Sequence, residues 1–199
     1  MKTSNLLITL FVITSVFACS DESEPPATPL MTEDPIVYEP YMFEYNGTKY
    51  TVYRENKSWL DAAEFAQSEG GKLVEINDQE EQDKIFMELT QFADINLDET
   101  IALESGTAKV WIGGNDIEEE GHWVWDGDND GVSDKFWIGD RDTGGSVDSR
   151  YNNWGYEPDN WQIQNGLAMG IVDWIFGVEG EWNDLSVENQ LYFVVEYEE

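Results

Sequence analysis

Glu157-Pro158-Asp159-Asn160-Trp161 and Trp182-Asn183-Asp184 are the segments from which the rest of this chain is interpreted. The first segment offers two carboxylates, the second offers an amide and a carboxylate, and each contains a tryptophan. Hard cations such as Ca2+ take six to eight oxygen ligands from groups of this kind. The two segments therefore predict a cation site. Free coordination positions on such a cation would also accept oxygens from a ligand.

The region before the first segment contains a predicted hairpin and two predicted helices. An Asn46-Gly47 turn between alternating aromatic residues predicts a hairpin over residues 43–53. Ser58 can cap a helix that ends at Gly70-Gly71. Asn77 or Asp78 can cap a second helix, whose acidic first turn suits the helix dipole. The residues of this helix that we expect to face inward are Ile85, Phe86, Leu89 and Phe92.

Most of the predicted strands lie in the second half of the chain. We expect strands at residues 72–76, 109–113, 122–125, 167–172, 180–182 and 191–197. Two early helices and mostly late strands predict an α+β domain. Residues 94–107 and 126–166 show no clear periodicity and are predicted to be loops. Because the second loop carries the oxygen-rich motif, we interpret it as the functional loop.

Further motifs follow one another in a fixed order along the globular part. They are Trp59 with Ala62 and Ala63, Gly70-Gly71-Lys72-Leu73, Glu80 and Glu81, Trp111-Ile112-Gly113-Gly114, Gly121-His122-Trp123-Val124-Trp125, Asn153-Trp154 and Phe193-Val194-Val195-Glu196. With the two oxygen-rich segments, this order and spacing resemble the C-type lectin-like family from about Phe43 to Tyr197. The resemblance implies two helices with antiparallel sheets and a long calcium-binding loop. Vertebrate members carry disulfides, whereas this chain resembles a cysteine-free bacterial relative, with Leu167 and Val195 at family cysteine positions.

The resemblance implies one calcium ion held by the long loop and the last strands. Its ligands by position are Glu157, Asp159, Asn183 and Asp184, with Asn165 where the family usually has another acidic ligand. The family also has a cis peptide bond before the proline of the first motif. Two adjacent sugar hydroxyls would complete the coordination and hydrogen-bond the same side chains. From the residues alone, these groups could also be solvated loop polars around a structural tryptophan.

The resemblance also bears on the kind of sugar. Glu-Pro-Asn resembles mannose-type binders and Gln-Pro-Asp resembles galactose-type binders, so that Glu157-Pro158-Asp159 is a hybrid. Trp161 stands where galactose-type relatives place a tryptophan that stacks on the apolar face of the sugar. Packing of Trp161 into a small core of the loop is the alternative. The expected partner is a galactose- or mannose-type carbohydrate, bound through Glu157, Asp159, Trp161, Asn183 and Asp184.

A second candidate cation site lies in Asp126-Gly127-Asp128-Asn129-Asp130-Gly131-Val132-Ser133-Asp134. Alternate acids followed by glycine resemble calcium loops of the EF-hand and thrombospondin-repeat kind. A glutamate at the twelfth position is missing, because Trp137 stands there. The candidate ligands are Asp126, Asp128, Asp130 and Asp134. A polar hairpin inserted in the long loop is the alternative interpretation.

The N-terminal region reads as export and attachment sequence. Residues 1–18 have a positive start and an apolar run too short to span a bilayer comfortably, and Val16-Phe17-Ala18-Cys19 resembles a bacterial lipobox. We expect a lipoprotein signal peptide at 1–18, lipidation of Cys19, an acidic, proline-rich tether at 19–41 and the lectin-like domain at 42–199. The expected location is the bacterial cell envelope, at the surface of the outer membrane.

Composition excludes several function classes. The 199 residues carry a formal net charge of −32, which rules against a nucleic-acid partner, since phosphate binding needs a basic surface. His122 is the only histidine and Cys19 the only cysteine, so nucleophilic catalysis and zinc ligation lack the usual residues. A hydrolase based on a carboxylate pair stays open. We expect a non-enzymatic, calcium-dependent carbohydrate-binding module used for adhesion or glycan capture. The alternative is a lectin-like domain that binds protein or another surface without a calcium–sugar bridge.

Overall fold

A computed structural model describes residues 39–159, 161 and 163–197, all within one compact unit, Val37–Glu199. The expected signal peptide, Cys19 and residues 19–38 of the tether lie outside the described residues. The boundaries of these segments therefore stay predictions. No helix among the described residues is long and apolar enough to cross a membrane.

The unit begins with the hairpin and the helix that local sequence predicted. Strands β1 (Tyr41–Tyr45) and β2 (Thr48–Lys57) pair antiparallel around Asn46 and Gly47, whose φ angles are 50° and 91°. Helix α1 (Trp59–Ser68) is capped by the Ser58 side chain, which accepts a hydrogen bond from a backbone N–H of the first turn. The buried residues of α1 are Trp59, Ala62, Ala63 and Ala66, which confirms the predicted apolar stripe.

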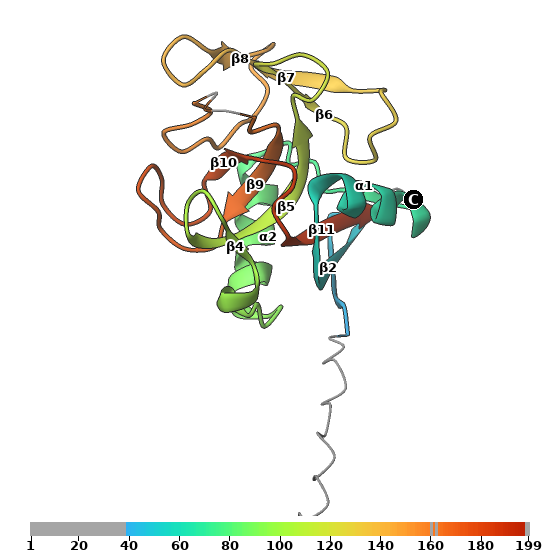
Figure 1. Cartoon of the computed structure of the whole chain (residues 1–199). Coiled ribbons are helices and arrows are strands. Elements are labelled where there is room, and N and C mark those ends of the chain that lie inside the picture. Colours follow the sequence, from blue (N-terminus) through green and yellow to red (C-terminus); the bar gives the residue numbers. More distant parts are fainter. Residues whose placement is uncertain (1–38, 160, 162, 198–199) are drawn as a thin grey trace, which may run out of the picture. The chain divides into compact units, whose positions relative to one another are not determined.

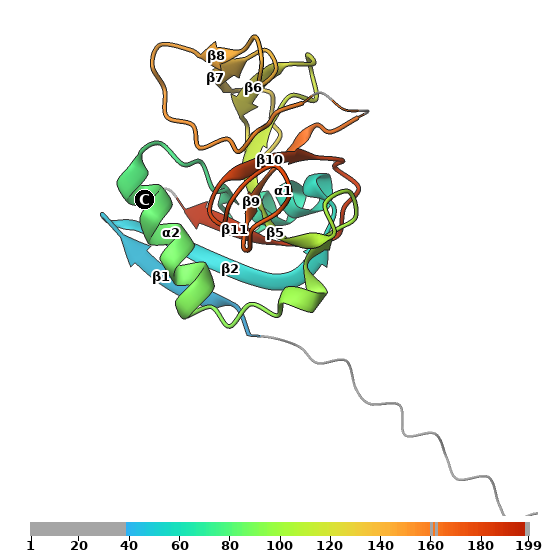
Figure 2. The same ribbon diagram turned by 90° about the vertical axis from the view of Figure 1, so that its left-hand side faces the viewer.

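Helix α2 (Gln79–Gln91) is capped by Asp78, one of the two residues predicted for this role. Ile85 and Leu89 are buried, and Phe86 packs against the core while staying partly exposed. The expectation for Phe92 is wrong, because its side chain is 54% exposed. The helix ends one residue earlier, and the backbone of Phe92 turns away from helical geometry at φ −128°. Figure 2 shows α2 lying across the β1–β2 hairpin.

One mixed sheet in the order β1-β2-β11-β5-β6-β7-β8 organises the unit (Figure 1). The remaining elements are β3 (Lys72–Leu73), the 3-10 turn η1 (Leu97–Glu99), β4 (Ile101–Ala102), β5 (Thr107–Asn115), β6 (His122–Trp125), β7 (Asp134–Ile138), β8 (Gly145–Ser146), β9 (Gly166–Gly170), β10 (Trp182–Leu185) and β11 (Leu191–Tyr197). The strand pairs are antiparallel, as expected, except that β5 and β11 are parallel. The two predicted loops are corrected, because they contain η1 with β4 and β7 with β8.

Two consecutive glycines let other elements approach β5 closely. A Cβ atom on Gly113 would lie 2.5 Å from the carbonyl oxygen of Leu73, and one on Gly114 would lie 2.4 Å from the Leu167 side chain. Neither contact is compatible with a side chain. The Trp-Ile-Gly-Gly motif therefore joins a buried tryptophan, Trp111, to two positions where neighbouring segments pack against bare backbone.

Tryptophans fill the core beneath the long loop. Trp182 is fully buried, and its ring meets those of Trp125, Phe136, Tyr151 and Trp154 at centroid distances of 5.5, 6.0, 5.6 and 6.2 Å. Its indole N–H donates a 2.8 Å hydrogen bond to the Gln82 side chain. The start of β10 is thereby held against both the long loop and α2.

Candidate functional site

Backbone hydrogen bonds bring the two oxygen-rich segments together. The Trp182 N–H donates to the Asn153 carbonyl at 2.7 Å, and the Gly155 N–H donates to the Trp182 carbonyl at 3.0 Å. The long loop is thus joined to the start of β10 just before Glu157 is reached. The Glu157–Pro158 peptide bond is cis, as the resemblance implied.

Three carboxylates of the predicted site converge. One oxygen from each of Glu157, Asp159 and Asp184 lies within 4.8 Å of the others. Oxygens that share one calcium ion lie 2.3–2.6 Å from it, so they can be at most about 5 Å apart. The spacing of the three carboxylates therefore suits a single calcium ion.

Buried acceptor oxygens around this cluster also fit a cation. Glu157 is 6% exposed and Asn183 is 3% exposed. Within the described part of the chain, no hydrogen bond reaches Glu157 Oε2, Asn165 Oδ1 or Asn183 Oδ1. Buried polar atoms are normally paired, and leaving one unpaired costs free energy. Oxygen donors of these types are the ones that calcium prefers, so the residues fit the ion that the family implies.

The carboxylates of this cluster are close enough to affect one another's pKa. Burial raises the pKa of Glu157 to about 8, and the negative charges of Asp184 and Asp159 add to the increase. The positive charge of Arg141 acts in the opposite direction, with its Nη1 atom 3.9 Å from Glu157 Oε2. Three carboxylates this close repel one another unless positive charge neutralises them.

Two basic residues beside the cluster were missed by sequence reasoning. Arg141 donates a 3.3 Å hydrogen bond to Asp159 Oδ2. Lys109 is fully buried, its Nζ atom lies 3.6 Å from the ring centroid of Trp174, and burial lowers its pKa to about 7 against the opposing charge of Glu157. Only 10 basic residues stand against 42 acids, so each one was a candidate partner for an acidic site. The sequence did not indicate which carboxylates each of them faces.

Apolar side chains form part of the rim of a cavity beside the carboxylates. Trp161 is 56% exposed and lines a cavity of about 80 Å³ together with Glu157, Asp159 and Asn183. The other apolar residues lining this cavity are Trp174, Ile175 and Phe176. A water molecule occupies about 30 Å³, so the cavity has room for an ion with a few waters but not for a larger ligand. Trp161 is exposed beside this cavity rather than packed in a core of the loop.

In the second predicted cation site, three of the four aspartates lie close together. Asp126, Asp128 and Asp130 bring carboxylate oxygens within 4.8 Å of one another. Asp134 is not among them, which corrects its assignment as a ligand. It begins β7, and its carboxylate pairs with Arg150 at 3.2 Å.

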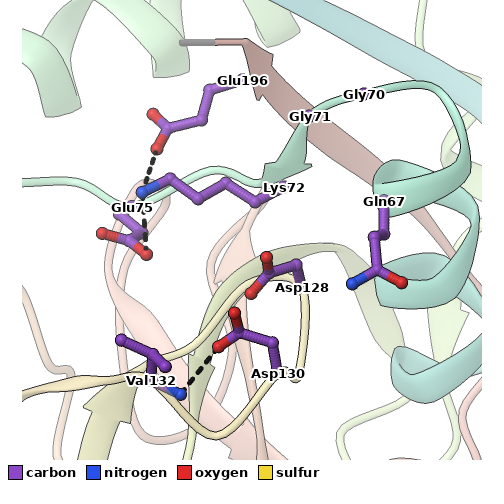
Figure 3. A pocket seen from close by; sticks show the side chains of 9 residues that line it. All are labelled: Gln67, Gly70, Gly71, Lys72, Glu75, Asp128, Asp130, Val132 and Glu196. Atoms are coloured by element: carbon purple, nitrogen blue, oxygen red, sulfur yellow. Dashed lines mark hydrogen bonds and ion pairs between the residues drawn. The ribbon is translucent and has the colours of Figure 1, made fainter.

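This second cluster already has partners of its own. The two carboxylate oxygens of Asp126 accept backbone N–H bonds from Asp130 and Gly131 at 3.0 and 3.2 Å. Figure 3 shows Asp128 and Asp130 lining a pocket that also contains Lys72, whose ammonium group lies between Glu75 and Glu196. The ammonium group of Lys72 thus already supplies a positive charge in this pocket. The loop that carries the aspartates is held by its own hydrogen bonds.

Asp116 provides a pH-dependent prediction near the first cluster. Burial raises its pKa to about 7 from 3.8, although a 2.8 Å hydrogen bond from the Gly121 N–H acts against the shift. The folded protein therefore keeps a proton that the unfolded chain releases. This contribution to stability is complete below about pH 4 and is lost as the pH rises to about 7. Three pKa units correspond to about 4 kcal/mol.

Asp116→Asn should remove this pH dependence, because the amide oxygen can still accept the Gly121 hydrogen bond and cannot ionise. We expect the variant to have a larger free energy of unfolding than the wild type at pH 8, and a similar one at pH 4. Urea denaturation at both pH values, without calcium, measures the difference. If the variant and the wild type differ in free energy of unfolding by the same amount at both pH values, the raised pKa of Asp116 is contradicted.

Comparisons with known proteins agree with this geometry. A model of the lectin C-type domain family matches residues 55–196. Asialoglycoprotein receptor 2 of Mus musculus is 27% identical over 143 residues, which make up 71% of this chain and 36% of that protein. The chain thus spans about a third of the length of this curated relative.

Solved structures share the fold. A mouse scavenger receptor C-type lectin carbohydrate-recognition domain is 26% identical, with a TM-score of 0.53 over 79% of this chain and 93% of that chain. A calcium-independent type II antifreeze protein, 18% identical, has a TM-score of 0.52 over 80% of this chain and 95% of its own. The predicted α+β lectin-like fold is confirmed, and the chain belongs to the lectin C-type domain family.

Proposed function

We propose that this chain is a calcium-dependent carbohydrate-binding module. The observation that carries the proposal is the convergence of buried carboxylate and amide oxygens beneath an exposed tryptophan. Family membership supports binding rather than catalysis, and the scavenger-receptor neighbour is itself a carbohydrate-recognition domain.

Several side chains would hold the ion and contact the sugar. Glu157, Asp159, Asn183 and Asp184 would hold the ion, with the amide oxygen of Asn165 as a further candidate. A bound calcium ion supplies coordination positions that two adjacent sugar hydroxyls can occupy. The same carboxylates and amides can hydrogen-bond those hydroxyls. Trp161 offers its exposed ring to the apolar face of a sugar.

The cellular setting is a separate part of the proposal. Cys19 would carry a lipid, and residues 19–41 would hold the domain away from a bacterial membrane, at the surface of the outer membrane. A small, shallow site binds weakly, so that adhesion or glycan capture would depend on many copies at one surface. Radiolabelled palmitate incorporation that is lost in Cys19→Ser would support the anchor, and unchanged incorporation would contradict it.

Glycan-array binding in millimolar calcium and again in EDTA tests the main proposal. We expect binding that EDTA removes, with free galactose and free mannose as competitors that identify the sugar type. Trp161→Ala should weaken binding of a galactose-type sugar about two- to tenfold, because an exposed stacking contact is worth about 0.5–1.5 kcal/mol. Binding that survives EDTA unchanged would contradict the calcium dependence.

A second function is favoured by one observation. Arg141 already places positive charge beside the carboxylates. The apolar rim of Trp161, Ile175 and Phe176 could then bind a protein or another surface without calcium. This alternative predicts attachment that is insensitive to EDTA and lost on replacing Ile175 by serine.

A further inference from the structure

Arg141 makes several of the hydrogen bonds that tie the β7–β8 loop to the oxygen-rich segment. Its backbone N–H donates to the Pro158 carbonyl at 2.7 Å, and its Nη1 donates to the Tyr156 carbonyl at 3.3 Å. The loop itself is held by Asp140, whose Oδ1 accepts the N–H groups of Asp142 and Thr143 at 3.0 and 2.7 Å. The position of Arg141 is therefore determined by hydrogen bonds at both its backbone and its side chain.

The guanidinium group of Arg141 lies against the candidate calcium ligands. Its Nη1 atom is 3.3 Å from Asp159 Oδ2 and 3.9 Å from Glu157 Oε2. The other oxygen of Asp159 accepts the Trp161 backbone N–H at 2.8 Å, so both oxygens of this carboxylate are engaged. The guanidinium also lies over the Tyr156 ring, with Cζ 4.3 Å from the centroid. Arginine is suited to this contact, because its planar cation both stacks on rings and pairs with carboxylates.

We propose that Arg141 is a built-in counter-ion that sets the calcium affinity of the site. Its positive charge compensates the carboxylates, and a divalent cation must compete with it for Asp159 and Glu157. A guanidinium group a few ångströms from a divalent ion repels that ion. Even when the repulsion is partly screened, it lowers the calcium affinity several-fold or more. The proposal rests on the calcium site of the proposed function and adds a residue that controls it.

Arg141 differs in exposure from Lys109, the other basic residue beside the cluster. Lys109 is fully buried against Trp174 and has no route to solvent without unpacking. The Arg141 side chain is 25% exposed, so it can turn outward when a cation arrives. Arg141 is therefore the counter-ion that can be displaced, whereas Lys109 stays packed against Trp174.

Calcium titration calorimetry of Arg141→Gln and Arg141→Lys tests the proposal. Glutamine keeps hydrogen-bonding capacity without charge, and we expect calcium to bind about tenfold more tightly, which corresponds to about 1.4 kcal/mol. Lysine keeps the charge and should leave the affinity within about threefold of the wild type. Arg150→Gln is the matched control, because Arg150 pairs with Asp134 in β7 and should not alter the affinity.

Unchanged or weaker calcium binding in Arg141→Gln would overturn the counter-ion role, since it would mean that Arg141 only positions Asp159. If the glutamine variant fails to fold, Arg141→Met removes the charge while keeping the stem that covers Tyr156, and the same shift is expected. The two proposals can fail separately. A wild type and an Arg141→Gln variant that both lack calcium binding would overturn the calcium site itself, whereas equal affinities would overturn only the counter-ion.

Discussion

Asp184→Asn should weaken calcium binding by at least about 100-fold, or about 2.7 kcal/mol. Asp184 is fully buried, and its carboxylate lies in the cluster with Glu157 and Asp159. Replacing it with an amide of nearly the same shape removes one negative charge from the ligands without creating a cavity. Calorimetric calcium titration measures the loss, and sugar binding should disappear with it.

The folded state should tolerate this change. The charge of Asp184 raises the pKa of Glu157, so its removal relieves a repulsion in the calcium-free protein. We expect the calcium-free melting temperature of Asp184→Asn to be equal to or higher than that of the wild type. Asp61→Asn makes the same chemical change at an exposed position of α1 and serves as the control. Wild-type calcium affinity in Asp184→Asn would exclude Asp184 as a ligand.

Trp182→Ala should lower the free energy of unfolding by about 4–8 kcal/mol. Truncating a buried tryptophan costs about 3–5 kcal/mol through lost packing and the cavity that remains. The Gln82 side-chain oxygen would also lose its 2.8 Å hydrogen bond from the indole, and an unpaired buried acceptor adds about 1–3 kcal/mol. A domain has a total stability of only about 5–15 kcal/mol, so this variant would be close to unfolding.

Trp161→Ala is the matched control for this prediction. Trp161 is the other tryptophan associated with the oxygen-rich segments, and it is 56% exposed, whereas Trp182 is fully buried. Urea denaturation should show almost no change for Trp161→Ala, although its sugar binding should weaken. Similar losses of stability in the two variants would contradict the division between a structural tryptophan and a ligand-facing one.

Local chemistry made much of the fold predictable. The Asn46-Gly47 turn, the Ser58 cap and the Asp78 cap each involve neighbouring residues, and all three occur as predicted. Phe92 was wrong because helix periodicity does not show where the last turn ends. Strands β7 and β8 were missed because short strands in a sequence rich in glycine and acids have no period. Pairing with β6 defines β7, and pairing with β7 defines β8.

The candidate site shows the same division between local and long-range information. Motif positions identified Glu157, Asp159, Asn183 and Asp184, and the structure brings the three carboxylates together. The regular spacing of acids over residues 126–134 was misleading at Asp134, because β7 turns that side chain toward Arg150. The spacing of acidic residues in the sequence does not show toward which neighbours a strand directs each side chain.

The sequence by itself determined the family, the elements that depend on neighbouring residues and the candidate oxygen donors of the proposed site. Only the tertiary structure decided that Trp161 faces outward and that Arg141 and Lys109 stand beside the carboxylates. The physical reason is that turns, caps and motif residues act over a few positions in the chain. The electrostatics of the cluster depend instead on charges from β5, the β7–β8 loop and β10, which become neighbours only when the chain folds.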